Sequence, residues 1–179
     1  MFRRLARHAV LFLVITHFAW SWNAGAASAD EYEIKAAFIY NFTKFVRWPD
    51  ADEGRPVILG ILGKDPFGGA IDRAVSGKHV GTRRIHVVRV AKPEDASRCD
   101  ILFVSASEEP NLKRILQGLG TAPVLTIGDT DGFAERGGMI NLVTEGNRVR
   151  FEINVEAMER AGLRASSQLL RLATIVTDR

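Results

Sequence analysis

The chain has 179 residues, of which 46% are hydrophobic and 25% are charged. These ordinary globular values exclude a wholly disordered, collagenous, low-complexity or multi-span membrane protein. The formal net charge is +3, but residues 1–29 hold three of the 24 basic residues and none of the 21 acidic ones. The rest of the chain therefore has 21 residues of each sign, so no surplus charge remains to drive general binding to polyanions such as nucleic acids.

Residues 1–29 have the order of a secretory signal peptide. Three arginines precede an apolar stretch over residues 9–20, and small residues follow it, ending in Ala-Ser-Ala. The stretch is shorter than the ~20 residues of a membrane-spanning helix, which favours cleavage over an uncleaved anchor. We predict a signal peptide cleaved near Ala29/Asp30 and one domain over residues 30–179.

Cys99 is the only cysteine, so the chain cannot form an internal disulfide. It begins the apolar run 99–104, where a buried and inert thiol is the expected state. An intermolecular disulfide is the alternative. Without a disulfide, a domain of this length depends on its hydrophobic core.

Residues 31–47 have the periodicity of a one-sided helix. Ile34, Phe38, Phe45 and Trp48 recur at intervals of three and four residues, and Pro49 ends the pattern. The aromatic face is expected to pack on a sheet. An exposed stripe that docks a partner is the alternative.

Short apolar runs then alternate with helical patterns. Strands are expected at 57–62, 84–90, 100–104 and 124–127, and helices at 66–75 and 105–117. This alternation predicts a mainly parallel sheet with helices on both faces.

The end of the chain predicts an antiparallel hairpin of strands 139–144 and 148–154, because a glycine-containing turn joins them. A helix at 155–161 and a last helix from Ser166 or Ser167 to residue 173 follow. The expected fold class is a single-domain α/β fold with a mixed, mainly parallel sheet, helices on both faces and a C-terminal antiparallel hairpin.

Catalytic motifs are few. His79 and His86 lack metal-ligand spacing, and Ser105 lies in no nucleophile elbow and is suited to capping a helix. The segment 60–65 departs from a phosphate-binding loop, and 129–132 departs from a calcium loop. We therefore predict no catalytic residues, no metal and no cofactor, which favours binding over turnover.

Two regions of the chain carry a more specific signal. The stretch EYEIKAAFIYNFTKFVRWP at 31–49 resembles the N-terminal signature of the YfiR family of exported bacterial proteins. The C-terminal half is similar in order and spacing: GGMI at 137–140, RVRFEIN at 148–154, AGL at 161–163 and SSQLLRLA at 166–173. The strand at 100–105 also fits, so the similarity covers essentially the whole chain after residue 29.

This resemblance implies a periplasmic regulator without enzyme activity or cofactor. The type member of the family restrains an inner-membrane diguanylate cyclase by binding its periplasmic domain, which lowers cyclic di-GMP and biofilm formation. The resemblance also implies a homodimer. Disulfide bonds stabilise the type member, but Cys99 has no partner here, so we do not expect redox control through an internal disulfide.

For the partner surface we select residues in the motif-rich C-terminal region: Arg150, Phe151, Glu152, Ile153 and Arg171. The alternation along 148–154 also allows another interpretation, in which Phe151 and Ile153 face the core and the charged residues form a solvated face.

Two further functions remain open at this stage. A periplasmic carrier or sensor of a small-molecule ligand would have its pocket at the carboxyl ends of strands, near Gly63, Ser105 and Gly128. A hydrolase would use Ser105 or His79.

Overall fold

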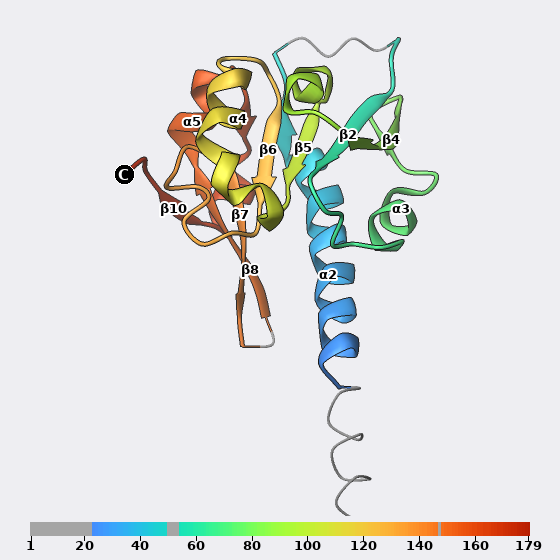
Figure 1. Cartoon of the computed structure of the whole chain (residues 1–179). Coiled ribbons are helices and arrows are strands. Elements are labelled where there is room, and N and C mark those ends of the chain that lie inside the picture. Colours follow the sequence, from blue (N-terminus) through green and yellow to red (C-terminus); the bar gives the residue numbers. More distant parts are fainter. Residues whose placement is uncertain (1–22, 50–53, 147) are drawn as a thin grey trace, which may run out of the picture.

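The computed structural model describes residues 23–49, 54–146 and 148–179 (Figure 1). The helices and strands follow in this order: α2 (Asn23–Phe45), β1 (Val46–Arg47), β2 (Val57–Leu62), α3 (Ala70–Val75), β3 (His79–Val80), β4 (Arg83–Val90), η1 (Pro93–Arg98), β5 (Ile101–Val104), η2 (Ala106–Asn111), α4 (Leu112–Leu119), β6 (Leu125–Gly128), β7 (Ile140–Glu145), β8 (Arg148–Asn154), α5 (Val155–Arg160), β9 (Arg164–Ala165), α6 (Ser167–Leu170) and β10 (Thr174–Val176).

The described strands form an eight-stranded sheet in the order β10-β8-β7-β6-β5-β2-β4-β3, and a separate pair, β1-β9. Strands β4, β2, β5, β6 and β7 run parallel to one another, whereas β3 is antiparallel to β4, and β7 and β8 form an antiparallel hairpin. The chain reverses its direction of winding between β2 and β5, where such sheets have their topological switch point. The predicted fold class is confirmed.

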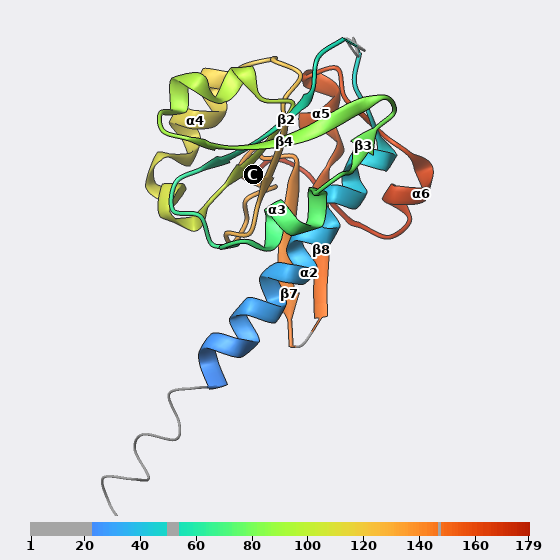
Figure 2. The same cartoon turned by 90° about the vertical axis from the view of Figure 1, so that its right-hand side faces the viewer.

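A hydrophobic core lies on each face of the sheet, between the strands and the helices that pack on them. Leu59, Ile101 and Phe103 pack with α2, α3, α5 and α6 on one face. Leu62 and Leu102 pack with η1 and α4 on the other. Figure 2 shows α4 on one side of the sheet and α2 and α6 on the opposite side. Apolar residues therefore alternate between two buried faces, which explains the continuous apolar runs of these strands.

Helix α2 differs from its prediction in extent and in the face that it buries. It spans Asn23–Phe45, and the next two residues leave the helix to pair with β9. Its buried positions include Ala36 and Ile39, whereas Ile34 is 45% exposed, so the expectation for Ile34 was wrong. The predicted cleavage point lies within the helix. Residues 1–22, the greater part of the predicted signal peptide, lie outside the described residues.

The last predicted helix is shorter than expected. Ser166 caps α6 by accepting a hydrogen bond from the Leu169 amide, but the helix ends at Leu170. Residues Thr174–Val176, beyond the predicted helix, form β10, parallel to β8 at the edge of the sheet. Three consecutive β-branched residues favour this extended conformation, and no strand was predicted there.

Candidate functional site

The five residues selected for the partner surface divide into two groups. Phe151 and Ile153 are 5% and 0% exposed, and the Phe151 ring lies 5.1 Å from that of Phe42 between centroids. They face the core, in line with the second interpretation of this strand, and in this conformation they offer little surface to a partner. Arg150 is exposed and pairs with Glu145 at 2.8 Å.

The other two selected residues lie near one edge of the sheet. Glu152 is partly exposed and accepts a hydrogen bond from the side-chain Nδ2 of Asn141 at 3.0 Å. Its register partner on β10 is Thr174. Arg171 is exposed at the end of α6, three residues before that strand. Glu152 is therefore next to β10 in the sheet, and Arg171 is next to β10 along the chain.

The edge also exposes two large apolar residues that the sequence analysis missed. Leu172 is 73% exposed and Ile175 is 50% exposed. The sequence analysis assigned Leu172 to the last predicted helix, which ended at residue 173, and assigned Ile175 to no element. Recognition of the β-branched run from Thr174 would have placed Ile175 on an edge strand, where partner strands and side chains can bind.

The predicted carrier pocket is packed with side chains and backbone. The Ser105 hydroxyl donates to the Lys64 carbonyl at 2.7 Å, and the Lys64 amide donates to Ser107 Oγ at 2.8 Å. A Cβ at Gly63 would lie 2.5 Å from the same Ser107 oxygen, and one at Gly128 would lie 2.5 Å from the Phe133 ring. These contacts leave little space for a ligand at that position.

Ser105 also has the structural role expected of a cap. Its side chain accepts a hydrogen bond from the Ser107 amide at the start of η2. His79 and His86 are exposed on β3 and β4. In the described parts of the chain, no three histidine, cysteine or acidic residues are grouped as metal ligands.

A buried ion pair joins α2 to the carboxyl end of the sheet. Lys35 and Asp129 have side chains that are 5% and 4% exposed, and Lys35 Nζ lies 2.8 Å from the carboxylate. Tyr32 donates to the same carboxylate at 2.8 Å, and burial together with that negative charge raises the pKa of Tyr32. Burial opposes ionisation of Glu31, but hydrogen bonds from Lys35 and Thr144 lower its pKa overall.

The sequence analysis missed this pair because a lysine in an amphipathic helix is expected to be solvated. The only sequence signal for its burial was its position: Lys35 lies four residues before Ile39, on the same face of the helix, and Ile39 is buried. The pair fixes α2 against the end of β6.

A second buried carboxylate, Asp100, lies at the amino end of β5. Arg55 binds it with two hydrogen bonds of 2.8 and 2.6 Å, and Arg83 adds one of 3.0 Å. The Ile58 amide donates a fourth hydrogen bond. Beside it, Cys99 is buried as predicted, and burial and the Asp100 charge raise the pKa of its thiol to about 11.

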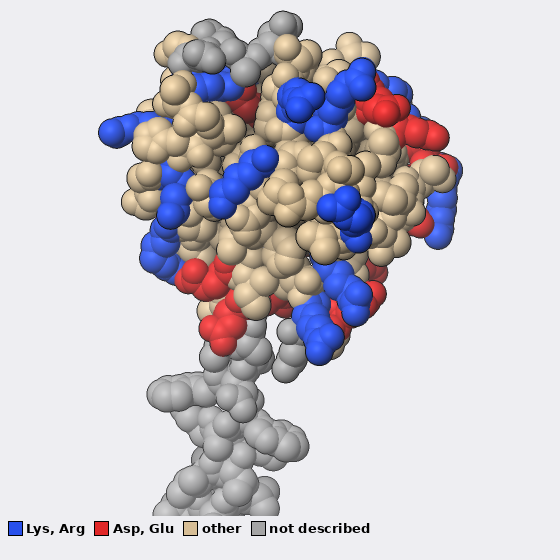
Figure 3. Space-filling view, turned by 180° about the vertical axis from the view of Figure 1, so that it is seen from behind, with Lys and Arg blue, Asp and Glu red and all other residues tan. Residues whose placement is uncertain are grey.

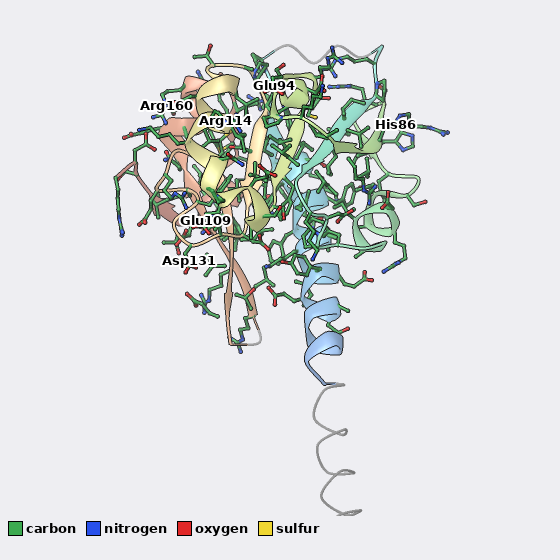
Figure 4. All side chains as sticks on the ribbon, viewed as in Figure 1. His86, Glu94, Glu109, Arg114, Asp131 and Arg160 are labelled. Atoms are coloured by element: carbon green, nitrogen blue, oxygen red, sulfur yellow. The ribbon has the colours of Figure 1, made fainter. Side chains whose placement is uncertain are left out.

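Three cavities lie away from these buried clusters. One of about 220 Å³ lies between α4, β6 and α5, one of about 370 Å³ between α3 and β4, and one of about 410 Å³ beside β1 and β9. The charged and titratable side chains labelled in Figure 4 come from separate elements and spread over the molecule without converging. The part of the chain described here contains no helix that is both long and apolar enough to span a membrane.

The chain belongs to the YfiR/HmsC-like family, whose family model matches residues 32–174. The match includes residues 32–49 and 137–173, which carried the resemblance, and the predicted family is confirmed. At family level, membership supports a periplasmic, non-catalytic regulator of a diguanylate cyclase.

Solved structures with a similar fold share little sequence. An ABC domain from Streptococcus pneumonia in complex with L-Trp has a TM-score of 0.56 and 9% identity over 79% of this chain and 60% of its own. A conserved domain protein from Vibrio cholerae has a TM-score of 0.50 and 12% identity, with 66% and 54% covered. The substrate-binding protein CD0873 from Clostridium difficile has a TM-score of 0.50 and 8% identity, with 69% and 55% covered. The chain thus spans between half and two thirds of their lengths, and the likeness concerns the fold alone.

Proposed function

We propose that this protein is an exported regulatory protein that restrains an inner-membrane diguanylate cyclase, or a similar sensor, by binding its periplasmic domain. The observation that carries this proposal is the family match over residues 32–174, which extends across the sheet from α2 to β10. In this proposal the leader is cleaved near Ala29 and the domain, as a monomer or homodimer, acts in the periplasm.

The mechanism is a shift between two states of the receptor. Binding outside the membrane favours an inactive arrangement of the cyclase only if the protein binds that arrangement more tightly than the active one. Such coupling requires a recognition surface and no chemical step. Cyclic di-GMP and biofilm formation then fall while the protein is bound.

The exposed members of the selected surface are suited to this contact. Arg171 supplies a charge, and the exposed Leu172 and Ile175 supply apolar area at the edge that β10 forms, while Arg150 and the partly exposed Glu152 lie on the neighbouring strand β8. A mixture of apolar anchors and arginines is typical of the energetically dominant part of a protein interface. Phe151 and Ile153 support this surface from below through packing.

The test is intracellular cyclic di-GMP in the source bacterium with and without the gene. We expect a rise on deletion that the full-length gene reverses and a form lacking residues 1–29 does not. An unchanged level, or rescue by the form without the leader, would refute a periplasmic restraint on a cyclase.

The surface is tested by complementation with Arg171→Glu and Leu172→Asp. Both side chains are exposed, so we expect the protein to accumulate normally but to lose most of its restraint. Lys113→Glu on α4 is the control, because Lys113 is exposed on the opposite side of the sheet. Equal activity of all three variants would remove this edge from the interface.

A small-molecule carrier or sensor is the second candidate, and the similar folds of an L-Trp complex and a substrate-binding protein favour it. A thermal-shift screen with L-Trp, other amino acids and vitamins tests it. A saturable rise in melting temperature supports the candidate, and the absence of a rise with every compound argues against it.

A further inference from the structure

A basic cavity lies where the end of α2 meets the short β1-β9 ribbon. It has a volume of about 410 Å³ and is lined by Lys44, Phe45, Val46, Arg47, Arg164, Ala165, Ser166 and Ser167. Three of these residues are basic and none is acidic. Figure 3 shows the face that carries α6, where Lys and Arg side chains spread over the middle and acidic residues lie mostly toward the edges.

The two arginines lie directly opposite each other in the ribbon. Arg47 is the register partner of Arg164, next to the pair Val46 and Ala165. Directly opposed side chains lie on the same face of a ribbon, with Cβ atoms roughly 4.5–5.5 Å apart. Both arginines are exposed, and neither forms a salt bridge with any residue that the structure describes.

Among the residues that the structure describes, this arrangement sets two positive charges side by side without a compensating acid. Like charges directly opposite in a β-ribbon are destabilising, whereas Arg73 and Arg89 on the same domain have carboxylate partners. Nine of the fifteen arginines that the structure describes form a salt bridge, and the ribbon brings together two of the six that do not. An anion between the two guanidinium groups would remove the repulsion.

Lys44 adds a third positive charge to the wall of the cavity. Its ammonium donates to Asn41 Oδ1 at 3.0 Å and lies 4.3 Å from the centre of the Tyr40 ring. Its place in the last turn of α2 is also favourable for a cation, because the carboxyl end of a helix is partially negative. That explanation accounts for Lys44 but leaves the arginine pair unexplained.

We propose that this cavity binds the phosphate group of a small phosphorylated solute. Guanidinium groups form paired hydrogen bonds with phosphate oxygens, and the two arginines match the two negative charges of a phosphate dianion, while the lysine adds a third positive charge. The Ser167 hydroxyl at the rim offers a further donor, and the half-buried Phe45 provides an apolar wall for the organic part. The volume falls in the range of about 300–1,000 Å³ typical of small-ligand pockets, which favours a solute over a flat membrane surface.

The test uses protein expressed from the full-length gene with its own leader and purified from the periplasmic fraction. Isothermal titration with inorganic phosphate and with phenyl phosphate, at constant ionic strength, measures the affinity. We expect saturable one-to-one binding that is several-fold tighter for phenyl phosphate. Arg47→Gln and Arg164→Gln are each expected to weaken binding at least tenfold, whereas Lys113→Gln leaves it unchanged.

Other outcomes overturn the proposal. Absence of saturation with both compounds refutes the site, and equal weakening by Lys113→Gln shows that only general charge attraction is present. Sedimentation with phosphatidylglycerol vesicles, without binding of either soluble phosphate, assigns the basic face to a membrane surface instead. The melting temperatures of the variants show that they are folded. The result does not depend on the cyclase partner, because it requires no receptor.

Discussion

Asp100 connects several segments through one buried carboxylate. Its side chain is 4% exposed and accepts hydrogen bonds from Arg55, Arg83 and the Ile58 amide. The Arg83 side chain is itself only 7% exposed, so it has little access to water if the carboxylate is removed. An unpaired buried charge is costly because it loses both its partner and its hydration.

We expect Asp100→Ala to lower the free energy of unfolding by about 3 kcal/mol, as measured by urea denaturation. Asp95→Ala is the matched control, because Asp95 pairs with Arg98 at 3.4 Å between side chains that are 46% and 82% exposed. Its cost should stay under about 1 kcal/mol. Equal costs for both variants would contradict a structural role for the buried cluster.

Cys99 should react slowly while the protein is folded. Burial raises the pKa of its thiol from 9.0 to about 11, and the thiolate is the reactive form. At pH 8 we expect a disulfide reagent to modify the native protein about 100-fold more slowly than the urea-unfolded protein. Rapid modification of the native protein would mean that the thiol is accessible.

The same shift gives Cys99 a pH dependence with a defined sign. The folded-state pKa is above the unfolded value, so the unfolded thiol ionises first as pH rises. Its contribution to stability is complete below pH 9 and decreases between about pH 9 and 11. Between about pH 9 and 11, the urea midpoint of the wild type should therefore fall relative to the midpoint of Cys99→Ala.

At the scale of the elements, Gly128 and Gly138 allow the backbone to pack directly against the ring of Phe133. A Cβ at Gly128 would lie 2.5 Å from the ring, and one at Gly138 would lie 2.2 Å from it. Phe133 is fully buried in the core beneath α4. A methyl group at either glycine therefore requires the ring to move.

We expect Gly138→Ala to destabilise the protein by about 2–3 kcal/mol, since added volume in a packed core forces strain. Gly118→Ala is the control, because it lies within α4 and its added methyl would meet nothing within 4 Å. Alanine is the better helix former, so this control should stabilise by up to about 1 kcal/mol. Thermal unfolding measures both changes.

In the β1-β9 ribbon, removal of a charged side chain should raise the stability of the protein, in contrast to the loss expected at Asp100. Arg164→Gln removes the repulsion from Arg47 and should raise stability slightly, by up to about 0.5 kcal/mol at low salt. The gain should disappear at high salt or in saturating phosphate. Destabilisation at low salt would show that the arginine side chain is needed for packing.

The sequence predicted the long elements better than the short ones. Strands β2, β5 and β6 follow from short apolar runs, and β4 and β8 follow from segments in which apolar and polar residues alternate. Strands β1 and β9 have two residues each, and their pairing joins positions more than 100 residues apart. No local pattern signals such a pairing, so the basic cavity that it forms could not be predicted from periodicity.

The candidate surface was predictable only in part, for a related reason. Alternation along β8 showed that Arg150 and Phe151 point to opposite faces, but not which face is buried. The packing of Phe38 and Phe42 against Phe151 decided that question. Similarly, the local pattern did not reveal that Lys35 faces Asp129, 94 residues away.

At the scale of the whole molecule, the chain closes its sheet with its last residues. Strand β10 covers the edge of β8, and the backbone amide of Arg179 donates to the Glu135 carbonyl at 2.9 Å. Asp178 accepts a hydrogen bond from Asn154 and pairs with Arg160 at 2.9 Å. Asp178 is therefore bound at both ends of α5, by Asn154 at its start and by Arg160 at its end.

This closure predicts that the last six residues matter for both stability and monodispersity. Asp178→Ala should cost about 1–2 kcal/mol, because Asn154 is fully buried and loses one of its hydrogen-bond partners. Deletion of residues 174–179 should cost more and leave β8 as an unpaired edge, which invites pairing with another copy. Urea denaturation and size-exclusion chromatography measure the two effects. Asp131→Ala, at an exposed turn, is the control and should change neither. If the truncated protein kept the wild-type midpoint and elution volume, β10 would contribute nothing to closing the sheet, and its exposed residues would be free to serve the partner alone.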